Sequence, residues 1–448
     1  MQTPEQTEPQ SDYTPWRAAK FYIPLVIQAA SQSLTYPLVA SIVSHGRNGV
    51  VDLAAFAQGL AVMFVICAIG GGLLTTGMVF GRDAEGFRQF KRLNLRLCVG
   101  LALVQTLICV HPFDRLVFSG MLGLAAPMDA IAREVLFLSI PLQVFFFLRH
   151  PGLVALYNAR ASAVANWGTL CRILLTACLS PLFVRLGYVG HLWGTLAMTG
   201  PVLLECVLLR WLARPYIRKL GHAAGETASL KTQLLFTIPL SFGGVLLASA
   251  GFMIGAFIAR AAEPARMLPI HYVTMGVVNP VGFAALRMQA VVLAFPPRDK
   301  RDHRIFKFAL LAGLALAVFP WVGQIPAVAR WYFGVIQNVP EGDIHLAMRA
   351  MLLISILPVI QALRGHAEGL AAWRRRPNAI LAGQAMNLAT LVCVLFLALN
   401  LNAPGYLMGV TAILTAAFMT FVTVRMGLFW DEMEDRLGRA PRVRVTEG

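Results

Sequence analysis

Twelve long apolar stretches, separated by short polar segments, run along the chain. They cover residues 20–44, 52–80, 93–111, 129–150, 162–186, 190–212, 233–260, 267–296, 305–326, 346–366, 377–401 and 404–428. Each has about 20 residues or more, enough for a helix to cross about 30 Å of hydrocarbon. Because the stretches are continuously apolar rather than alternating, they predict helices and not the strands of a membrane barrel. The pattern predicts an all-α polytopic membrane protein.

The second half of the chain repeats the first at a nearly constant offset, close to half the chain length. The matches are Ile23-Pro24-Leu25 with Ile238-Pro239-Leu240, Phe90-Lys91 with Phe306-Lys307, Pro141 with Pro358, Leu148-Arg149 with Leu363-Arg364, and Gly190 to Gly194 with Gly405 to Gly409. Internal similarity of this kind is typical of transporters built from two like halves. Six stretches per half return the chain to its starting side, so we expect two parallel six-helix bundles that meet at a central cleft.

Composition and charge support the membrane assignment. Hydrophobic residues make up 57% of the chain and charged residues 13%, whereas about 25% of a soluble domain is charged. The net charge of +16 is spread over short loops and forms no single basic face, so we expect no nucleic-acid binding. About 28 of the 38 Lys and Arg residues lie in the terminal segments and in the loops after even-numbered stretches. This bias predicts that both termini are cytoplasmic.

The predicted organisation has five parts. Residues 1–19 would form a disordered cytoplasmic tail, 20–213 an N-lobe, 214–231 a cytoplasmic linker, 232–428 a C-lobe, and 429–448 a second cytoplasmic tail. The N-terminal segment lacks the basic start and short apolar core of a secretory signal. All seven cysteines fall in apolar stretches without a CxxC pair, so we expect buried thiols and no metal site.

Polar side chains within apolar stretches are costly in a bilayer and are therefore candidate functional positions. The amide candidates are Gln28, Gln32, Asn158, Gln289 and Asn387. The structural alternative is an interhelical hydrogen bond, which contributes about 1 kcal/mol or less. Glu205 and Glu368 lie near span interiors and are candidates for ion coupling. The first stretch, residues 21–43, has no acidic residue, although a cation-coupled drug extruder normally needs a membrane-embedded carboxylate.

Arginines in or beside the stretches point to an anion site. The predicted substrate-binding set is Arg149, His150, Arg172, Arg287, Arg364 and His366. Arg149 and Arg364 are expected near the cytoplasmic mouth, where they can extend to the interface. Arg172 and Arg287 lie deeper, where guanidinium groups facing a wet cavity would bind phosphate or carboxylate groups bidentately. Pairing with an acid such as Glu205 is the alternative.

The two histidines are candidates for pH dependence, since an unperturbed histidine titrates near pH 6.5, and a capping or interface role is the alternative. The sequence has no Walker loop, zinc-ligand spacing or nucleophile elbow. We therefore expect no catalytic residues, no cofactor and no enzymatic activity. Transport energy would come from a gradient of substrate, ions or potential.

The tenth stretch carries a more specific motif. Residues 355–359 (SILPV) followed by 364–369 (RGHAEG) resemble the progressive ankylosis (ANK) family. Pro141 with His150-Pro-Gly152, and Gly77 to Phe80 before a basic loop, are similar to the same family. Two six-helix bundles of this polarity resemble the multidrug/oligosaccharidyl-lipid/polysaccharide (MOP) flippase superfamily, which includes the MATE extruders. The resemblance implies a MATE-like fold and export of small polyanions such as pyrophosphate, nucleotides or citrate.

The leading hypothesis is a secondary transporter of a bacterial inner membrane that exports a small polyanion by alternating access between two lobes. We expect a monomer whose partners are the anionic substrate and the lipid bilayer. Three alternatives stay open: a cation-coupled multidrug extruder, a flippase of lipid-linked glycans, and a membrane receptor or assembly factor that transports nothing.

Overall fold

The computed structural model describes residues 13–32, 35–47, 50–122, 124, 128–221, 227–258, 260–297, 303–336 and 339–436. Throughout these ranges the chain forms helices and connecting turns, and no β-strand occurs in them. The prediction of an all-α fold is confirmed. Most of the two predicted tails, and residues 222–226 of the predicted linker, lie outside the described ranges.

The helices of the first half form the N-lobe. They are α1 (Pro15–Gln32), α2 (Thr35–Ser44), α3 (Val50–Ala68), α4 (Leu73–Phe80), α5 (Ala84–Ile108), the π-helix η1 (Arg115–Met121), α6 (Met128–Leu138), α7 (Ile140–Leu148), α8 (His150–Asn158), α9 (Ser162–Arg185) and α10 (His191–Arg218). Helix α1 begins within the predicted N-terminal tail, and α10 continues into the predicted linker.

The helices of the second half form the C-lobe. They are α11 (Leu230–Ile258), α12 (Pro264–Leu286), α13 (Met288–Ala294), α14 (Arg304–Val322), α15 (Pro326–Ala329), the π-helix η2 (Arg330–Ile336), the 3-10 helix η3 (Glu341–Asp343), α16 (Ile344–Ile354), α17 (Leu357–Trp373), α18 (Pro377–Asn400) and α19 (Gly405–Arg436). Helix α19 extends past the predicted end of the C-lobe at residue 428.

Ten of the twelve predicted spans correspond to helical segments of the described chain that are long and apolar enough to cross a membrane. The other two are helical as well. Helices α1 and α2 occupy most of 20–44, and α5 occupies most of 93–111. The first turns of α5 carry Arg88, Lys91 and Arg92, which lower its hydropathy.

The fourth and tenth predicted spans end well before their helical runs do. The fourth continues through α6, α7 and α8 to Asn158, and the tenth continues to Trp373. Proline lies in the first turn of α7, α8 and α17, where its missing N–H removes no hydrogen bond from the helix. Arg149 and Arg364 therefore lie inside these helical runs and not at their ends.

The repeat seen in the sequence governs the whole architecture. One repeat is the separation of Arg149 from Arg364 in the sequence. When α9 is shifted by this separation, its first and last residues coincide with those of α18, and the same holds for the π-helices η1 and η2.

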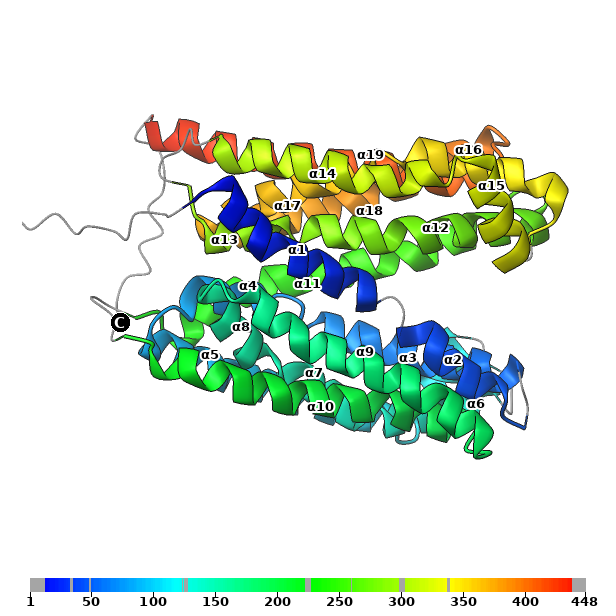
Figure 1. Cartoon of the computed structure of the whole chain (residues 1–448), viewed down its shortest axis with the longest axis horizontal. Coiled ribbons are helices and arrows are strands. Elements are labelled where there is room, and N and C mark those ends of the chain that lie inside the picture. Colours follow the sequence, from blue (N-terminus) through cyan, green and yellow to red (C-terminus); the bar gives the residue numbers. More distant parts are fainter. Residues whose placement is uncertain are drawn as a thin grey trace, which may run out of the picture.

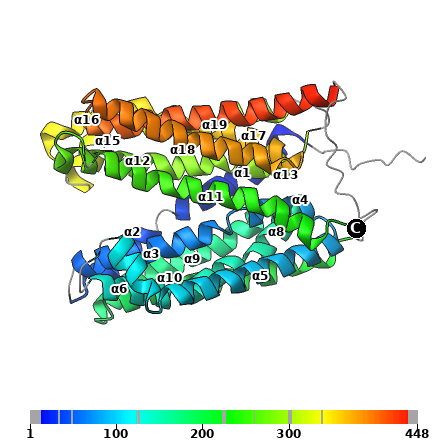
Figure 2. The ribbon, with the colours of Figure 1, turned by 180° about the vertical axis from the view of Figure 1, so that it is seen from behind.

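The first long helix of each half packs on both lobes. Helix α1 contacts α9 of its own lobe but also α12 and α13, while α11 contacts α18 and also α3, α4 and α5. Figures 1 and 2 show α1 and α11 running between the two bundles.

The lobes are joined at the end of the molecule where α1 begins and α19 ends, the left end in Figure 1. Here the last carbonyls of α13 accept hydrogen bonds from the N-lobe. Arg82 Nη2 donates to Leu293 O over 2.9 Å, and Arg160 Nε donates to Ala294 O over 2.9 Å. Cations at a helix C-terminus satisfy carbonyls that have no partner within the helix.

Two arginine–aromatic pairs lie across the same end. The guanidinium of Arg160 lies over the Phe295 ring at 4.4 Å, and that of Arg375 lies over the Phe80 ring at 5.0 Å. The two arginines stand one repeat apart, as do the two phenylalanines, and both arginines have left-handed backbones. Each lobe therefore presents its arginine to the aromatic ring of the other.

Candidate functional site

A fully buried carboxylate is the centre of a polar network in the N-lobe. Glu205, on α10, has an exposed fraction of 0%. Its Oε2 lies 3.1 Å from Arg149 Nη1 and 3.3 Å from Arg172 Nη1. Thr169 donates its hydroxyl to Oε1 over 2.8 Å. Two cations thus surround one anion, and the cluster as a whole is positive.

A hydrogen-bond chain leads from this network toward the other lobe. Gln28 Nε2 on α1 donates to Thr169 Oγ1 over 2.9 Å, and Tyr157 donates its hydroxyl to Gln28 Oε1 over 2.7 Å. Each donor along the chain finds an acceptor, as buried polar groups in a membrane require. Gln28 is therefore part of the N-lobe network, and Tyr157 is its end at the lobe interface.

The C-lobe buries an equivalent arginine with a different partner. Arg364, 1% exposed, donates from Nε to Glu368 Oε1 over 2.8 Å and from Nη2 to Gln384 Oε1 over 2.8 Å. Gln384 in turn donates to Glu368 Oε1 over 3.0 Å. Arg149 and Arg364 match in the repeat, but their acids come from α10 and from α17 respectively.

A neutral pair replaces the second ion pair in the C-lobe. Asn387 and Thr420 stand one repeat after Arg172 and Glu205. Asn387 Nδ2 donates to Thr420 Oγ1 over 2.9 Å. The same contact between adjacent helices is therefore charged in one lobe and neutral in the other.

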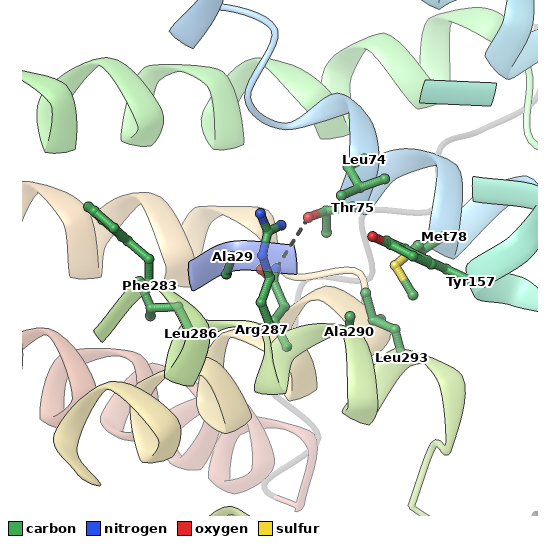
Figure 3. Close-up of a pocket in the computed structure, with 11 residues that line it drawn as sticks. Ala29, Leu74, Thr75, Met78, Tyr157, Phe283, Leu286, Arg287, Ala290 and Leu293 are labelled. Atoms are coloured by element: carbon green, nitrogen blue, oxygen red, sulfur yellow. Dashed lines mark hydrogen bonds between the residues drawn. The ribbon is translucent and has the colours of Figure 1, made fainter. Parts of the chain in front are cut away.

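A cavity of about 460 Å³ lies between the lobes. It is lined by Ala29, Leu74, Thr75, Met78 and Tyr157 of the N-lobe and by Phe283, Leu286, Arg287, Gln289, Ala290 and Leu293 of the C-lobe. Figure 3 shows Arg287 extending from the junction of α12 and α13 into this space. Gln289 Nε2 donates to Thr75 Oγ1 over 3.3 Å, which joins the two walls.

Arg287 differs from the other three arginines. It makes no ion pair with any acid of the described residues, and no Asp or Glu is among the described residues that line the cavity. Its guanidinium offers N–H donors in a planar fork that fits carboxylate, sulfonate or phosphate groups. The surrounding surface is mostly apolar, which strengthens electrostatic interactions within it. The arrangement favours an anion over a cation.

A second cavity of about 490 Å³ lies within the C-lobe. Its polar lining includes His271, Asn279, Gln361, Arg364 and Asn387, and no acid is among the lining residues. Arg364 is already held by Glu368, and Asn387 by Thr420. This cavity therefore has less free cationic character than the one around Arg287.

The remaining predicted residues whose side chains are described are not among the lining residues of either cavity. His150 Nδ1 lies 3.2 Å from Asn94 Oδ1, and the His366 ring packs edge-on against Phe306. Asn158 donates to the carbonyls of Gly77 and Gly81 at the end of α4. Gln32 ends α1, and its side chain lies outside the described atoms. In the described part of the chain, no cluster of His, Cys, Asp or Glu could hold a metal ion.

The structure adds residues that the sequence did not single out. Thr75 and Tyr157 line the cavity between the lobes, and Thr169 connects Gln28 to Glu205. Single Thr and Tyr residues are frequent in membrane helices, so only their three-dimensional position distinguishes them.

No family model and no curated protein matches this sequence. Solved structures, however, match it over nearly its whole length. An outward-facing multidrug resistance MATE transporter of the MOP superfamily is 16% identical, with a TM-score of 0.73 over 95% of this chain and 97% of its own. A eukaryotic MATE transporter is 16% identical, with a TM-score of 0.72 over 95% and 98%.

A third match is a MOP superfamily transporter from Pyrococcus furiosus, for which reverse polarity of the binding pocket suggests a different function. It is 16% identical, with a TM-score of 0.67 over 94% of this chain and 95% of its own. These matches do not confirm the resemblance to the ANK family. Identities this low show the fold alone: the chain has the fold of the MATE transporters of the MOP superfamily.

Proposed function

We propose that this protein is a secondary transporter that carries a small anion through the cavity between its lobes by alternating access. The observation that carries the proposal is Arg287, a cation without an acidic partner among the described residues, in a cavity shared by both lobes. A MATE-like fold joined at one end is consistent with the rocking of two bundles. Because none of the described lining residues carries a carboxylate, a transported cation would meet uncompensated positive charge there.

The two acids suggested for ion coupling are poorly placed for that role. Glu205 faces two guanidinium groups and Glu368 faces one. A carboxylate already neutralised by arginine gains little from binding a proton or sodium ion. We therefore assign both acids to holding helices together.

A multidrug extruder is the second candidate, because the cavity lining is mostly apolar and one fold neighbour is a multidrug resistance transporter. Proteoliposome uptake separates the two. The purified protein would be tested with radiolabelled anions, including pyrophosphate and citrate, and with a cationic dye. Anion uptake that falls about tenfold or more in Arg287→Gln supports the proposal. Dye uptake that survives or rises in the same variant, without anion uptake, refutes it.

A further inference from the structure

Resting on the proposed function, we infer that the substrate is an amphiphilic monoanion: an organic molecule with one carboxylate or sulfonate group and an apolar body. This differs from the densely charged polyanions that the sequence resemblance implies. The distinction follows from the number of charges in the cavity, the donors they offer, and the composition of the remaining wall.

The described lining of the cavity supplies one formal charge. Arg287 is the single Lys, Arg or His among the described residues that line it. A polyanion enclosed there would keep several negative charges without a counter-ion, and burying an unpaired charge is strongly unfavourable. The Arg149–Arg172–Glu205 cluster adds a positive field, but neither arginine of that cluster lines the cavity. One anionic group can be matched at this site.

The donors are arranged for a single anionic group. None of the N–H groups of Arg287 is used by the described residues, so two parallel ones can bind one anionic group bidentately. Thr75 accepts a hydrogen bond from Gln289, so its own hydroxyl proton can be donated to a ligand. These groups lie on facing walls, as Figure 3 shows, and the anionic group would sit between them.

The rest of the wall is apolar. Leu74 and Met78 of α4 face Phe283, Leu286 and Leu293 from the other lobe. Buried apolar surface favours a ligand that replaces water with hydrocarbon, and methionine adapts to ligands of different shape. A volume of about 460 Å³ falls in the usual range for small-molecule sites. A small inorganic anion would leave most of this surface wet.

The test is uptake by the full-length protein in proteoliposomes with four matched probes. Naphthalene-1-sulfonate has a permanent charge and an apolar body, while methanesulfonate has the same headgroup without that body. Pyrophosphate represents the polyanions, and a naphthylmethyl-trimethylammonium ion keeps the body with the opposite charge. We expect naphthalenesulfonate uptake to exceed that of the other three by about tenfold or more.

Variants assign the effect to the cavity. Arg287→Gln should abolish naphthalenesulfonate uptake, and Arg287→Lys, which keeps the charge but not the fork, should reduce it. Phe283→Ala should lower naphthalenesulfonate uptake. The matched controls Arg185→Gln and Phe319→Ala alter exposed residues that line neither cavity and should leave uptake unchanged.

Two kinds of failure are distinguishable. If pyrophosphate or methanesulfonate moves as fast as naphthalenesulfonate and depends on Arg287, the substrate class is wrong but anion transport stands. If the ammonium ion alone moves, or none of the four probes moves, the proposed function fails together with the inference.

Discussion

At the scale of single residues, the buried charges of the N-lobe depend on one carboxylate. Glu205 pairs with both Arg149 and Arg172, whereas each arginine has only this acid as an ion-pair partner among the described residues. Losing the acid leaves two uncompensated cations in the lobe interior. Losing Arg172 leaves Glu205 paired with Arg149 and hydrogen-bonded by Thr169.

We therefore expect Glu205→Gln to be more destabilising than Arg172→Met. Removing the acid leaves buried cations without a counter-ion, at a cost of about 3–5 kcal/mol, whereas removing Arg172 breaks only one of the two ion pairs of Glu205 and should cost less. Thr420→Val, at the repeat-related position of the C-lobe, removes a neutral bond and should cost about 1 kcal/mol or less. Thermal unfolding in detergent would rank the three variants. If all three variants lost the same stability, the charge of the Glu205 cluster would not contribute more to stability than a neutral hydrogen bond does.

The sequence pointed to Glu205 as the alternative partner of the deeper arginines, and Arg172 does pair with it, but the partners of Arg149 and Arg364 were not predicted. Arg364 and Glu368 are four residues apart, which places both on one face of the helix, so the sequence alone can predict this pair. Arg149 and Glu205 come from helices far apart in the chain, and no pattern along the sequence links them. Only the three-dimensional packing separates the paired arginines from Arg287.

At the scale of elements, the apolar pattern predicted where helices lie better than where they end. In the sequence, Arg149 and Arg364 look like span ends, because a charged residue usually lies at the membrane interface. In the structure, each arginine is largely buried and paired with a glutamate, so the helical run continues past it. The repeat predicts more detail than hydropathy does. Gly187 and Asn402, one repeat apart, both have left-handed backbones after α9 and α18, where glycine or asparagine is favoured.

Helix α13 is short, and its last turn depends on the other lobe. Leu293 and Ala294 direct their carbonyls to Arg82 and Arg160. Replacing Arg82 with Met removes a donor and a cation from that terminus, which should weaken it by about 1–2 kcal/mol. We expect amide hydrogen exchange in peptides covering 288–297 to accelerate about 5- to 30-fold. Arg96→Met, on the exposed side of α5, is the matched control. Unchanged hydrogen exchange in Arg82→Met would mean that the last turn of α13 is stable without the hydrogen bond from Arg82.

At the scale of the whole molecule, the joined end brings like charges together. Burial, with the neighbouring guanidinium groups of Arg160 and Arg375, lowers the pKa of Arg82 below its ordinary value. Carbonyls and aromatic rings of the opposite lobe hold these arginines in place. Under the proposed alternating access, opening of this end would have to break these contacts.

The two reciprocal arginine–aromatic pairs should therefore affect the equilibrium between the closed and open forms of this end. A cation–π contact contributes about 0.5–2 kcal/mol, so Phe80→Leu with Phe295→Leu should shift the equilibrium toward the open end by about 2 kcal/mol, roughly thirtyfold. Each single variant should give about half that free energy. Spin labels at Lys91 and Lys307, exposed and repeat-related in the two lobes, would report a longer distance in a cysteine-free background.

The repeat also supplies the control for this experiment. Phe118 and Phe333 are buried in η1 and η2, one repeat apart, and take no part in the joined end. Phe118→Leu with Phe333→Leu should cost stability without changing the distance between the labels. If the Phe80 and Phe295 variants likewise leave that distance unchanged, then hydrogen bonds to α13 and the crossing of α1 and α11 hold the end closed. The two aromatic pairs would then be consequences of closure and not its cause.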